Sequence, residues 1–190
     1  MSGNSTQSVR IIAGKWRSRQ LNFPCADGLR PTGNRIRETL FNWLAPHIEG
    51  ARCLDIFAGS GALSFEALSR GAELCIALDK NPDVVSQLQK NQSTLDADNL
   101  HILSVDAAIY LSSTNPQPAF DIIFLDPPFA GSFYTQISQL LVDKGWLCDG
   151  ALIYCESPVL EQLKLPHNWQ LHREKTAGDV KYCLYQHIEL

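Results

Sequence analysis

From residue 51 onward, short apolar runs typical of strands alternate with segments whose apolar residues recur at helical spacing. This alternation constrains the fold more than any other feature, because strands joined by helical crossovers pair in parallel. The predicted strands are 52–57, 74–78, 100–105, 121–125 and 151–155, and the predicted helices are 62–70, 82–95, 107–111 and 132–143. The sequence therefore predicts an α/β fold built on a parallel sheet.

Both ends of the chain depart from this alternation. Two apolar runs, 169–175 and 180–188, are separated by the turn sequence Ala-Gly-Asp at 177–179, which predicts an antiparallel hairpin at the end of the sheet. Residues 35–48 place apolar side chains on one helical face. We therefore expect a basic arm and helix over 1–50, packed on an α/β domain over 51–190.

Charge is distributed unevenly along the chain. The net charge is −4, yet residues 1–37 hold seven cations and one acid, so the remaining residues are strongly acidic. A basic arm on an acidic body is typical of a protein that binds a polyanion with one end. A basic tail that is only solvated would show the same charge pattern and is the alternative. Apolar residues among the cations, Trp16, Leu21, Phe23 and Pro31, favour an arm that docks on the body.

Composition excludes several classes of protein. Hydrophobic residues make up 45% of the chain, and no apolar run approaches the ~18 residues that a membrane helix needs. Residues 1–8 lack the apolar stretch of a secretion signal, so we expect a cytoplasmic protein.

The six cysteines form no CxxC pair and the five histidines are scattered, which predicts reduced core thiols and no metal site. Nothing indicates an obligate dimer, and we expect a monomer.

A glycine-rich turn, Asp55–Gly61, follows the first predicted strand directly, where open α/β sheets bind ligands. The next two strands end at Asp79 and Asp106, which could accept hydrogen bonds from ribose hydroxyls and an adenine amine. A simple loop would also explain the glycines, but the three acids in register predict a nucleoside site. Its expected residues are Asp55, Phe57, Ala58, Gly59, Ser60, Gly61, Ala62, Asp79, Lys80, Asn81, Asp106 and Ala107.

Two nucleoside cofactors fit this turn. A dinucleotide site calls for a third glycine at position 64, where the chain has Ser64. S-adenosylmethionine has no phosphates and needs only the turn, and Asp55 could hold its cationic amino-acid end. The sequence favours S-adenosylmethionine and leaves a nicotinamide-dependent oxidoreductase as the alternative.

The fourth predicted strand runs into Asp126, Pro127, Pro128 and Phe129, the expected catalytic residues. Prolines remove N–H donors, so nearby carbonyls stay free to accept. Hydrogen bonds to the Asp126 carboxylate and such a carbonyl would localise the lone pair of a ring-bound amine for methyl transfer. Phe129 would stack on the unpaired base, and the gain would come from positioning rather than from a metal. A strand ended by prolines and an aromatic plug is the structural alternative.

With these motifs the chain resembles the RsmD family of bacterial 16S rRNA (guanine-N2)-methyltransferases, which are Rossmann-like class I S-adenosylmethionine-dependent enzymes. The segments that carry the resemblance are Arg10–Gly14, Leu29–Thr32, Arg35–Leu44, Leu54–Leu63, Glu66–Ala72 and Asp126–Phe129. Two positions depart from the family pattern, because Ser18 stands where glycine is expected and Asn34 where aspartate is expected.

The resemblance implies a seven-stranded, mostly parallel sheet that ends in the antiparallel hairpin, with S-adenosylmethionine as methyl donor. It implies as target the N2 amine of a guanine in 16S rRNA, within the small ribosomal subunit or an assembly intermediate. The residues it places against RNA are Arg10, Lys15, Arg17, Arg19, Arg30, Pro31, Thr32, Arg35 and Arg37. Methylation of DNA adenine or of a protein glutamine, and RNA binding without catalysis, are the remaining alternatives.

Overall fold

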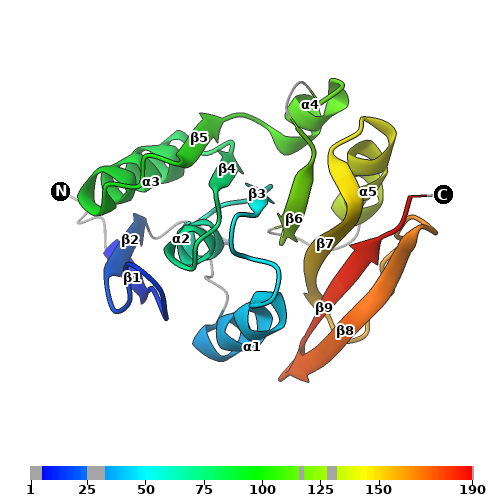
Figure 1. Cartoon of the computed structure of the whole chain (residues 1–190), viewed down its shortest axis with the longest axis horizontal. Coiled ribbons are helices and arrows are strands. Elements are labelled where there is room, and N and C mark those ends of the chain that lie inside the picture. Colours follow the sequence, from blue (N-terminus) through cyan, green and yellow to red (C-terminus); the bar gives the residue numbers. More distant parts are fainter. Residues whose placement is uncertain (1–5, 25–32, 116–117, 128–131, 190) are drawn as a thin grey trace.

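The computed structural model describes residues 6–24, 33–115, 118–127 and 132–189 (Figure 1). The strands are β1 (Thr6–Arg10), β2 (Gln20–Pro24), β3 (Arg52–Asp55), β4 (Leu74–Asp79), β5 (Leu100–Ser104), β6 (Phe120–Leu125), β7 (Leu147–Pro158), β8 (Trp169–Ala177) and β9 (Val180–His187). The helices are α1 (Asn34–Leu44), α2 (Ala62–Ser69), α3 (Pro82–Leu95), α4 (Ala107–Ser112) and α5 (Ser132–Asp143).

Seven strands form one sheet in the order β5-β4-β3-β6-β7-β9-β8. The strands from β3 to β7 are parallel, and β9 runs antiparallel to both β7 and β8, so the predicted parallel sheet and its terminal hairpin are confirmed. The chain leaves β3 toward β4 and later returns to its other side with β6. The strand order reverses between β3 and β6, which is where open α/β sheets form their ligand crevice.

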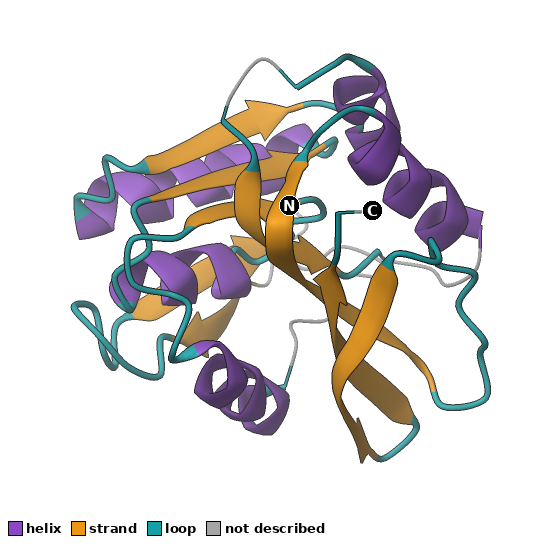
Figure 2. Cartoon of the chain, turned by 45° about the vertical axis from the view of Figure 1, so that its right-hand side comes forward, coloured by secondary structure: helices purple, strands orange, loops and turns teal. Residues whose placement is uncertain are grey.

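Helices cover both faces of the sheet (Figure 2). Successive residues of β3, Cys53 and Leu54, belong to two different apolar clusters, as the alternation of side chains along a strand requires. The Cys53 cluster includes Phe65 and other residues of α1, α2 and α3, whereas the Leu54 cluster includes Ile137 and other residues of α4 and α5. This double coverage explains why consecutive residues of a central strand, such as Ile122–Leu125 of β6, are all apolar and buried.

Local capping sets the starts of two helices, as predicted. The side chain of Asn81 accepts a hydrogen bond of 2.9 Å from the Asp83 N–H, and Pro82 occupies the first position of α3. The Asp106 side chain caps α4 by accepting from the N–H groups of Ala108 and Ile109, at 2.9 and 3.3 Å. Both caps follow strands that end at the same edge of the sheet.

Two elements were predicted with bounds that were wrong by three or more residues. The helix expected over 35–48 ends at Leu44. Ala45 still has helical backbone angles, but the helix cannot continue because Pro46 has no N–H to donate to the preceding turn. The strand expected over 151–155 extends from Leu147 to Pro158, since β7 pairs with β9 as far as Pro158 and with β6 from Leu147. Asp149 and Gly150 interrupt the apolar run before Ala151. They fit within β7 because the pairing with β6 shifts register between Phe120 and Ile122.

The basic arm forms an antiparallel hairpin, β1–β2, that the charge pattern did not predict. Three of its expected apolar anchors, Trp16, Leu21 and Phe23, are buried in the same cluster as α1, α2 and α3, and the fourth, Pro31, lies outside the described residues. The Trp16 ring lies edge-on to the ring of Phe65 in α2, with 6.5 Å between centroids. The described part of the arm is therefore docked on the body through these apolar side chains.

The described cysteines are free thiols, and Cys53, Cys75, Cys155 and Cys183 are buried, in agreement with core packing. Within the described ranges, no helix has the length and apolar character to cross a membrane. The same part of the chain holds no cluster of three or more histidine, cysteine, aspartate or glutamate residues suited to a metal ion.

Candidate active site

Four aspartates lie at the carboxyl edge of the parallel strands. Asp55 ends β3 and Asp79 ends β4. Asp106 follows β5 and Asp126 follows β6, which is hydrogen-bonded to β3. Phe124, two residues before Asp126, is the register partner of Asp55 across the reversal in strand order. The structure thus brings together the acids that the sequence placed at successive strand ends.

The glycine turn between β3 and α2 is held by main-chain contacts. Gly59 and Gly61 have φ values of 49° and 75°, a left-handed conformation that favours glycine. The Gly59 N–H donates to Asp79 Oδ2 at 3.0 Å, which ties the turn to the end of β4. A Cβ on Gly61 would lie 2.5 Å from Leu88 and 2.9 Å from Phe65, so this glycine permits α2 to pack against α3.

Asp55 is almost fully buried at the start of this turn, with 3% of its surface exposed. Ser64 Oγ donates to Asp55 Oδ2 at 2.6 Å, so the residue that breaks the dinucleotide pattern orients the carboxyl group. Burial raises the pKa of Asp55 to about 7, the Ser64 bond opposes the rise, and the Asp79 charge adds to it. A cation placed beside Asp55 would favour its ionised form.

The other two acids of the expected cofactor site, Asp79 and Asp106, are held in defined orientations. Asp79 Oδ1 accepts from the Asn81 N–H at 2.8 Å, while Oδ2 accepts from Gly59. Asp106 uses Oδ1 to cap α4. A carboxylate has about four lone-pair sites, so these bonds orient both groups and leave capacity to accept from a ligand.

This set of groups tests which cofactor fits. Three carboxylates can accept from hydroxyls, an amine and an ammonium group, whereas they repel a pyrophosphate. Among the cofactor-binding candidates the only cation is Lys80, whose side chain is exposed. The residues present therefore fit S-adenosylmethionine and disfavour a dinucleotide.

The start of the segment that the sequence predicts to be catalytic lies beside the turn, because β6 pairs with β3. Asp126 is half-buried and Pro127 is buried, whereas Pro128 and Phe129 lie outside the described residues. Phe57, after β3, meets Phe133 of α5 edge-on at 6.0 Å between ring centroids. This aromatic contact joins the glycine turn to the helix that follows the catalytic segment.

Two residues near Asp126, Glu156 and Tyr134, were not predicted from the sequence. Glu156 lies in β7, where its side chain accepts a hydrogen bond from the hydroxyl of the buried Tyr154. The hydroxyl of Tyr134, in α5, donates to the main-chain oxygen of Glu156. The position of Glu156 in the sequence could have indicated it, because Glu156 directly follows the predicted strand 151–155, just as Asp126 directly follows the predicted strand 121–125.

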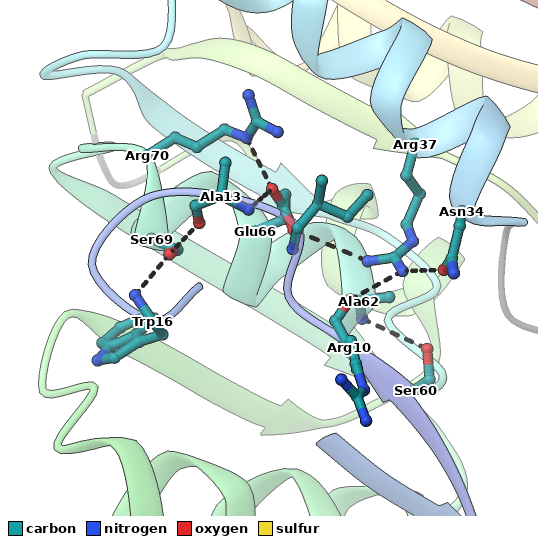
Figure 3. Close-up of polar contacts among 11 residues, drawn as sticks. Arg10, Ala13, Trp16, Asn34, Arg37, Ser60, Ala62, Glu66, Ser69 and Arg70 are labelled. Carbon is teal, nitrogen blue, oxygen red and sulfur yellow. Dashed lines mark hydrogen bonds and ion pairs between the residues drawn. The ribbon is translucent and has the colours of Figure 1, made fainter. Parts of the chain in front are cut away.

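A buried glutamate in α2 attaches the arm to the site (Figure 3). Glu66 accepts from the main-chain N–H groups of Ile12 and Ala13, at 2.7 and 3.0 Å, and from Arg70 Nε at 2.7 Å. Ser69, one turn further along α2, donates its hydroxyl to the Ala13 carbonyl at 2.6 Å. The helix that begins at the glycine turn therefore also carries the arm.

The expected RNA-contacting residues divide into three groups. The exposed ones are Arg10, Lys15, Arg17, Arg19 and Arg35. Arg37 is fully buried, with Nη2 donating to the Arg10 carbonyl and to Asn34 Oδ1 at 2.9 and 2.6 Å, so its expected contact with RNA is wrong for this structure. Helix geometry turns Arg37 toward α2 while Arg35 faces outward. Arg30, Pro31 and Thr32 lie outside the described residues.

A family model described as "Conserved hypothetical protein 95" matches residues 9–186. The chain is 50% identical over 179 residues to "Ribosomal RNA small subunit methyltransferase D" of Escherichia coli K12, covering 94% of this chain and 89% of that protein. The protein of the same name from Haemophilus influenzae is 46% identical over 185 residues, covering 96% of each chain. The chain belongs to the RsmD family.

Solved structures agree with this assignment to the RsmD family. "Putative methyltransferase yhhF from Escherichia coli" superposes with a TM-score of 0.89 and 48% identity, covering 97% of this chain and 100% of that one. A putative methylase from Haemophilus influenzae gives a TM-score of 0.83 at 44% identity, covering 96% and 100%. An RNA methyltransferase from Salinibacter ruber in complex with S-adenosyl-L-homocysteine, at 15% identity and a TM-score of 0.64, shares the fold. This RsmD chain is a class I methyltransferase.

Proposed function

We propose that this protein transfers a methyl group from S-adenosylmethionine to the N2 amine of a guanine in 16S rRNA, in the small ribosomal subunit or its assembly intermediate. The observation that carries the proposal is the place of Asp126, which follows β6 beside the glycine turn of β3. The relatives named for small-subunit rRNA methylation support the choice of substrate. A monomer acting in the cytoplasm, where ribosomal subunits assemble, is part of the same proposal.

When bound, S-adenosylmethionine supplies an electrophilic methyl group on a sulfonium sulfur. The buried Asp55, oriented by Ser64, would hold the ammonium of its amino-acid part. Asp79 would accept from the ribose hydroxyls, and Asp106 from the adenine amine. Each acid is already positioned by hydrogen bonds, so little reorganisation is needed on binding.

Asp126 would act on the target base. The lone pair of a guanine N2 amine is delocalised into the ring, so the free amine is a weak nucleophile. A carboxylate that accepts from its N–H groups localises the lone pair and stabilises the positive charge that develops on nitrogen. Positioning of this kind requires the base to leave its stacked environment, as in other enzymes that modify bases.

The exposed cations of the arm would hold the RNA backbone. Arg10, Arg17 and Arg19 lie on or between β1 and β2, and Arg35 lies at the start of α1. The arm itself is fixed to α2 through Glu66 and Ser69. This attachment would fix the distance between the exposed arginines, which bind RNA phosphates in this proposal, and Asp126 at the edge of the sheet.

The test is methyl transfer from tritium-labelled S-adenosylmethionine to naked 16S rRNA and to intact small subunits, followed by nucleoside analysis. We expect labelled N2-methylguanosine with the wild-type chain. Asp126→Asn should reduce the rate at least 100-fold, while cofactor affinity stays within about tenfold, or ~1.4 kcal/mol. The matched control is Asp98→Asn, an exposed acid before β5 at the opposite edge, which should leave the rate unchanged. Label in another nucleoside, or full activity of Asp126→Asn, would overturn the proposal.

A further inference from the structure

A second carboxylate lies beside Asp126 at the edge of the sheet. Leu125 of β6 and Cys155 of β7 are register partners in a parallel ladder, so Asp126 and Glu156 are the next residues along the two chains. Both carboxylates contribute to the raised pKa of Tyr134 and of Tyr154, after the larger effect of burial. The two acids are thus close to the same pair of phenols.

The tyrosines fix Glu156. Tyr154 and Tyr134 are 0% and 1% exposed, and burial raises the pKa of each, so both hydroxyls remain protonated and donate. One donates to the Glu156 carboxylate and the other to its main-chain oxygen. Glu156 is half-buried, so this residue with its oriented carboxylate is not enclosed in the core.

The neighbours of Glu156 place it on the side of the RNA-facing helix. Its register partner on β9 is Tyr182, whose ring stacks on Trp43 of α1 with 5.5 Å between centroids. Helix α1 begins with Asn34 and carries the exposed Arg35. The Asp126–Glu156 pair therefore lies between the cofactor edge and the helix that the proposed function turns toward RNA.

Two adjacent carboxylates match one kind of base edge. Guanine presents two neighbouring donors, the N1–H and the N2 amine. Adenine and 2-aminopurine present an amine beside an unprotonated N1, whose lone pair a carboxylate repels. A site built to accept a hydrogen bond rejects an analogue that lacks the donor, because the acceptor loses that bond and faces the lone pair of the analogue instead.

We infer that Glu156 is a specificity-determining residue that accepts a hydrogen bond from the N1–H of the target guanine while Asp126 accepts from its N2 amine. This inference rests on the proposed function and assigns the part of that site that selects the base. Tyr154 is a positioning residue, since it acts through the carboxylate of Glu156.

The test compares 16S rRNA carrying guanine with semi-synthetic 16S rRNA carrying 2-aminopurine at the nucleotide that the wild-type chain methylates. Both bases have the N2 amine, and only guanine has the N1–H. We expect the wild type to prefer guanine at least ~100-fold in kcat/KM. Glu156→Gln can donate its amide to an unprotonated N1, so it should lower this preference at least tenfold while the Kd for S-adenosylmethionine stays within twofold.

Two further variants keep the inference falsifiable. Glu156→Asp retains the charge one methylene further away and should lower kcat/KM for guanine at least tenfold, even if Glu156→Gln does not fold. Glu161→Gln, in the loop after β7, is the matched control and should keep the wild-type preference. An unchanged preference in Glu156→Gln, or full guanine activity in Glu156→Asp, would overturn the role of Glu156. Absence of N2-methylguanosine with the wild type would instead overturn the proposed function.

Discussion

Arg37 of α1 and Glu66 of α2 form an ion pair that is withdrawn from solvent, with 3.8 Å between Nη1 and Oε2 and 0% exposure of both side chains (Figure 3). Burial lowers the pKa of Arg37, and the Glu66 charge opposes that shift. In the described part of the chain, Arg37 Nε and Nη1 have no hydrogen-bond partner. The negative charge of Glu66 therefore offsets part of the cost of burying the positive charge of Arg37.

Removing the charge of Glu66 should destabilise the fold strongly. Glu66→Gln leaves Arg37 as an uncompensated buried cation, and such a loss costs about 3–5 kcal/mol. Arg37→Met should cost less, because Glu66 keeps Arg70 and two main-chain N–H donors. Urea unfolding of both single variants and the double variant measures the coupling, which should be at least ~1 kcal/mol. Additive costs would show that the pair is not coupled.

Stability should depend on the ionisation of Asp55. Its pKa rises from 3.8 to about 7 in the folded chain, so the folded state binds a proton that the unfolded state has lost between these values. Stability from this group is present at low pH and is lost as the pH rises from about 4 to 7. The free energy of unfolding of Asp55→Asn, relative to that of the wild type, should therefore rise by roughly 1–4 kcal/mol between pH 4 and pH 8.

The measurement for Asp55→Asn is denaturant unfolding of the cofactor-free chain at both pH values. The matched control, Asp98→Asn, alters an exposed acid and should show a difference that hardly changes with pH. A pH-independent difference for Asp55→Asn would mean that the carboxyl group titrates normally in the folded chain.

Ser18 should be replaceable by glycine with a gain in stability. It has a φ of 68°, in the left-handed region, within the connection between β1 and β2. A side chain in this conformation destabilises the folded state by about 1–2 kcal/mol. Glycine removes that cost, but its greater conformational freedom in the unfolded chain offsets up to about 1 kcal/mol of the gain. Ser18→Gly should therefore raise the free energy of unfolding by about 0.5–1 kcal/mol, whereas Ser18→Ala, which keeps the Cβ, should not. Equal effects of both variants would exclude a backbone cause.

The exposed arginines of the arm should determine the salt dependence of RNA binding. Replacing Arg10, Arg17 and Arg19 by alanine should weaken binding and flatten the plot of log K against log salt by roughly 0.7–0.9 for each phosphate that the arm no longer neutralises. Filter binding to 16S rRNA over a range of salt concentrations gives the slope. Lys144→Ala, after α5 at the opposite edge of the sheet, is the control and should leave the slope unchanged. An unchanged slope in the triple variant would remove the arm from the RNA interface.

Features encoded within a few residues were predictable from the sequence. The alternation of strands and helices, the caps at Asn81 and Asp106 and the final hairpin all depend on contacts between near neighbours in the chain. The expected glycine at position 18 also has a local cause, since Ser18 adopts a left-handed conformation there. Parallel pairing then brings the ends of β3, β4, β5 and β6 to one edge, so the position of Asp55, Asp79 and Asp106 at that edge could be predicted without knowledge of packing.

Only the tertiary structure decided which polar residues face inward and which acids become neighbours. Arg37 reads as one more cation of a basic segment, yet it is buried against Glu66, and the Ile12 N–H reaches that glutamate across 54 residues of sequence. Glu156 becomes the neighbour of Asp126 only because β7 pairs with β6. The physical reason is that charge and periodicity report the preferences of a segment alone, whereas burial and strand order depend on which distant segments pack together.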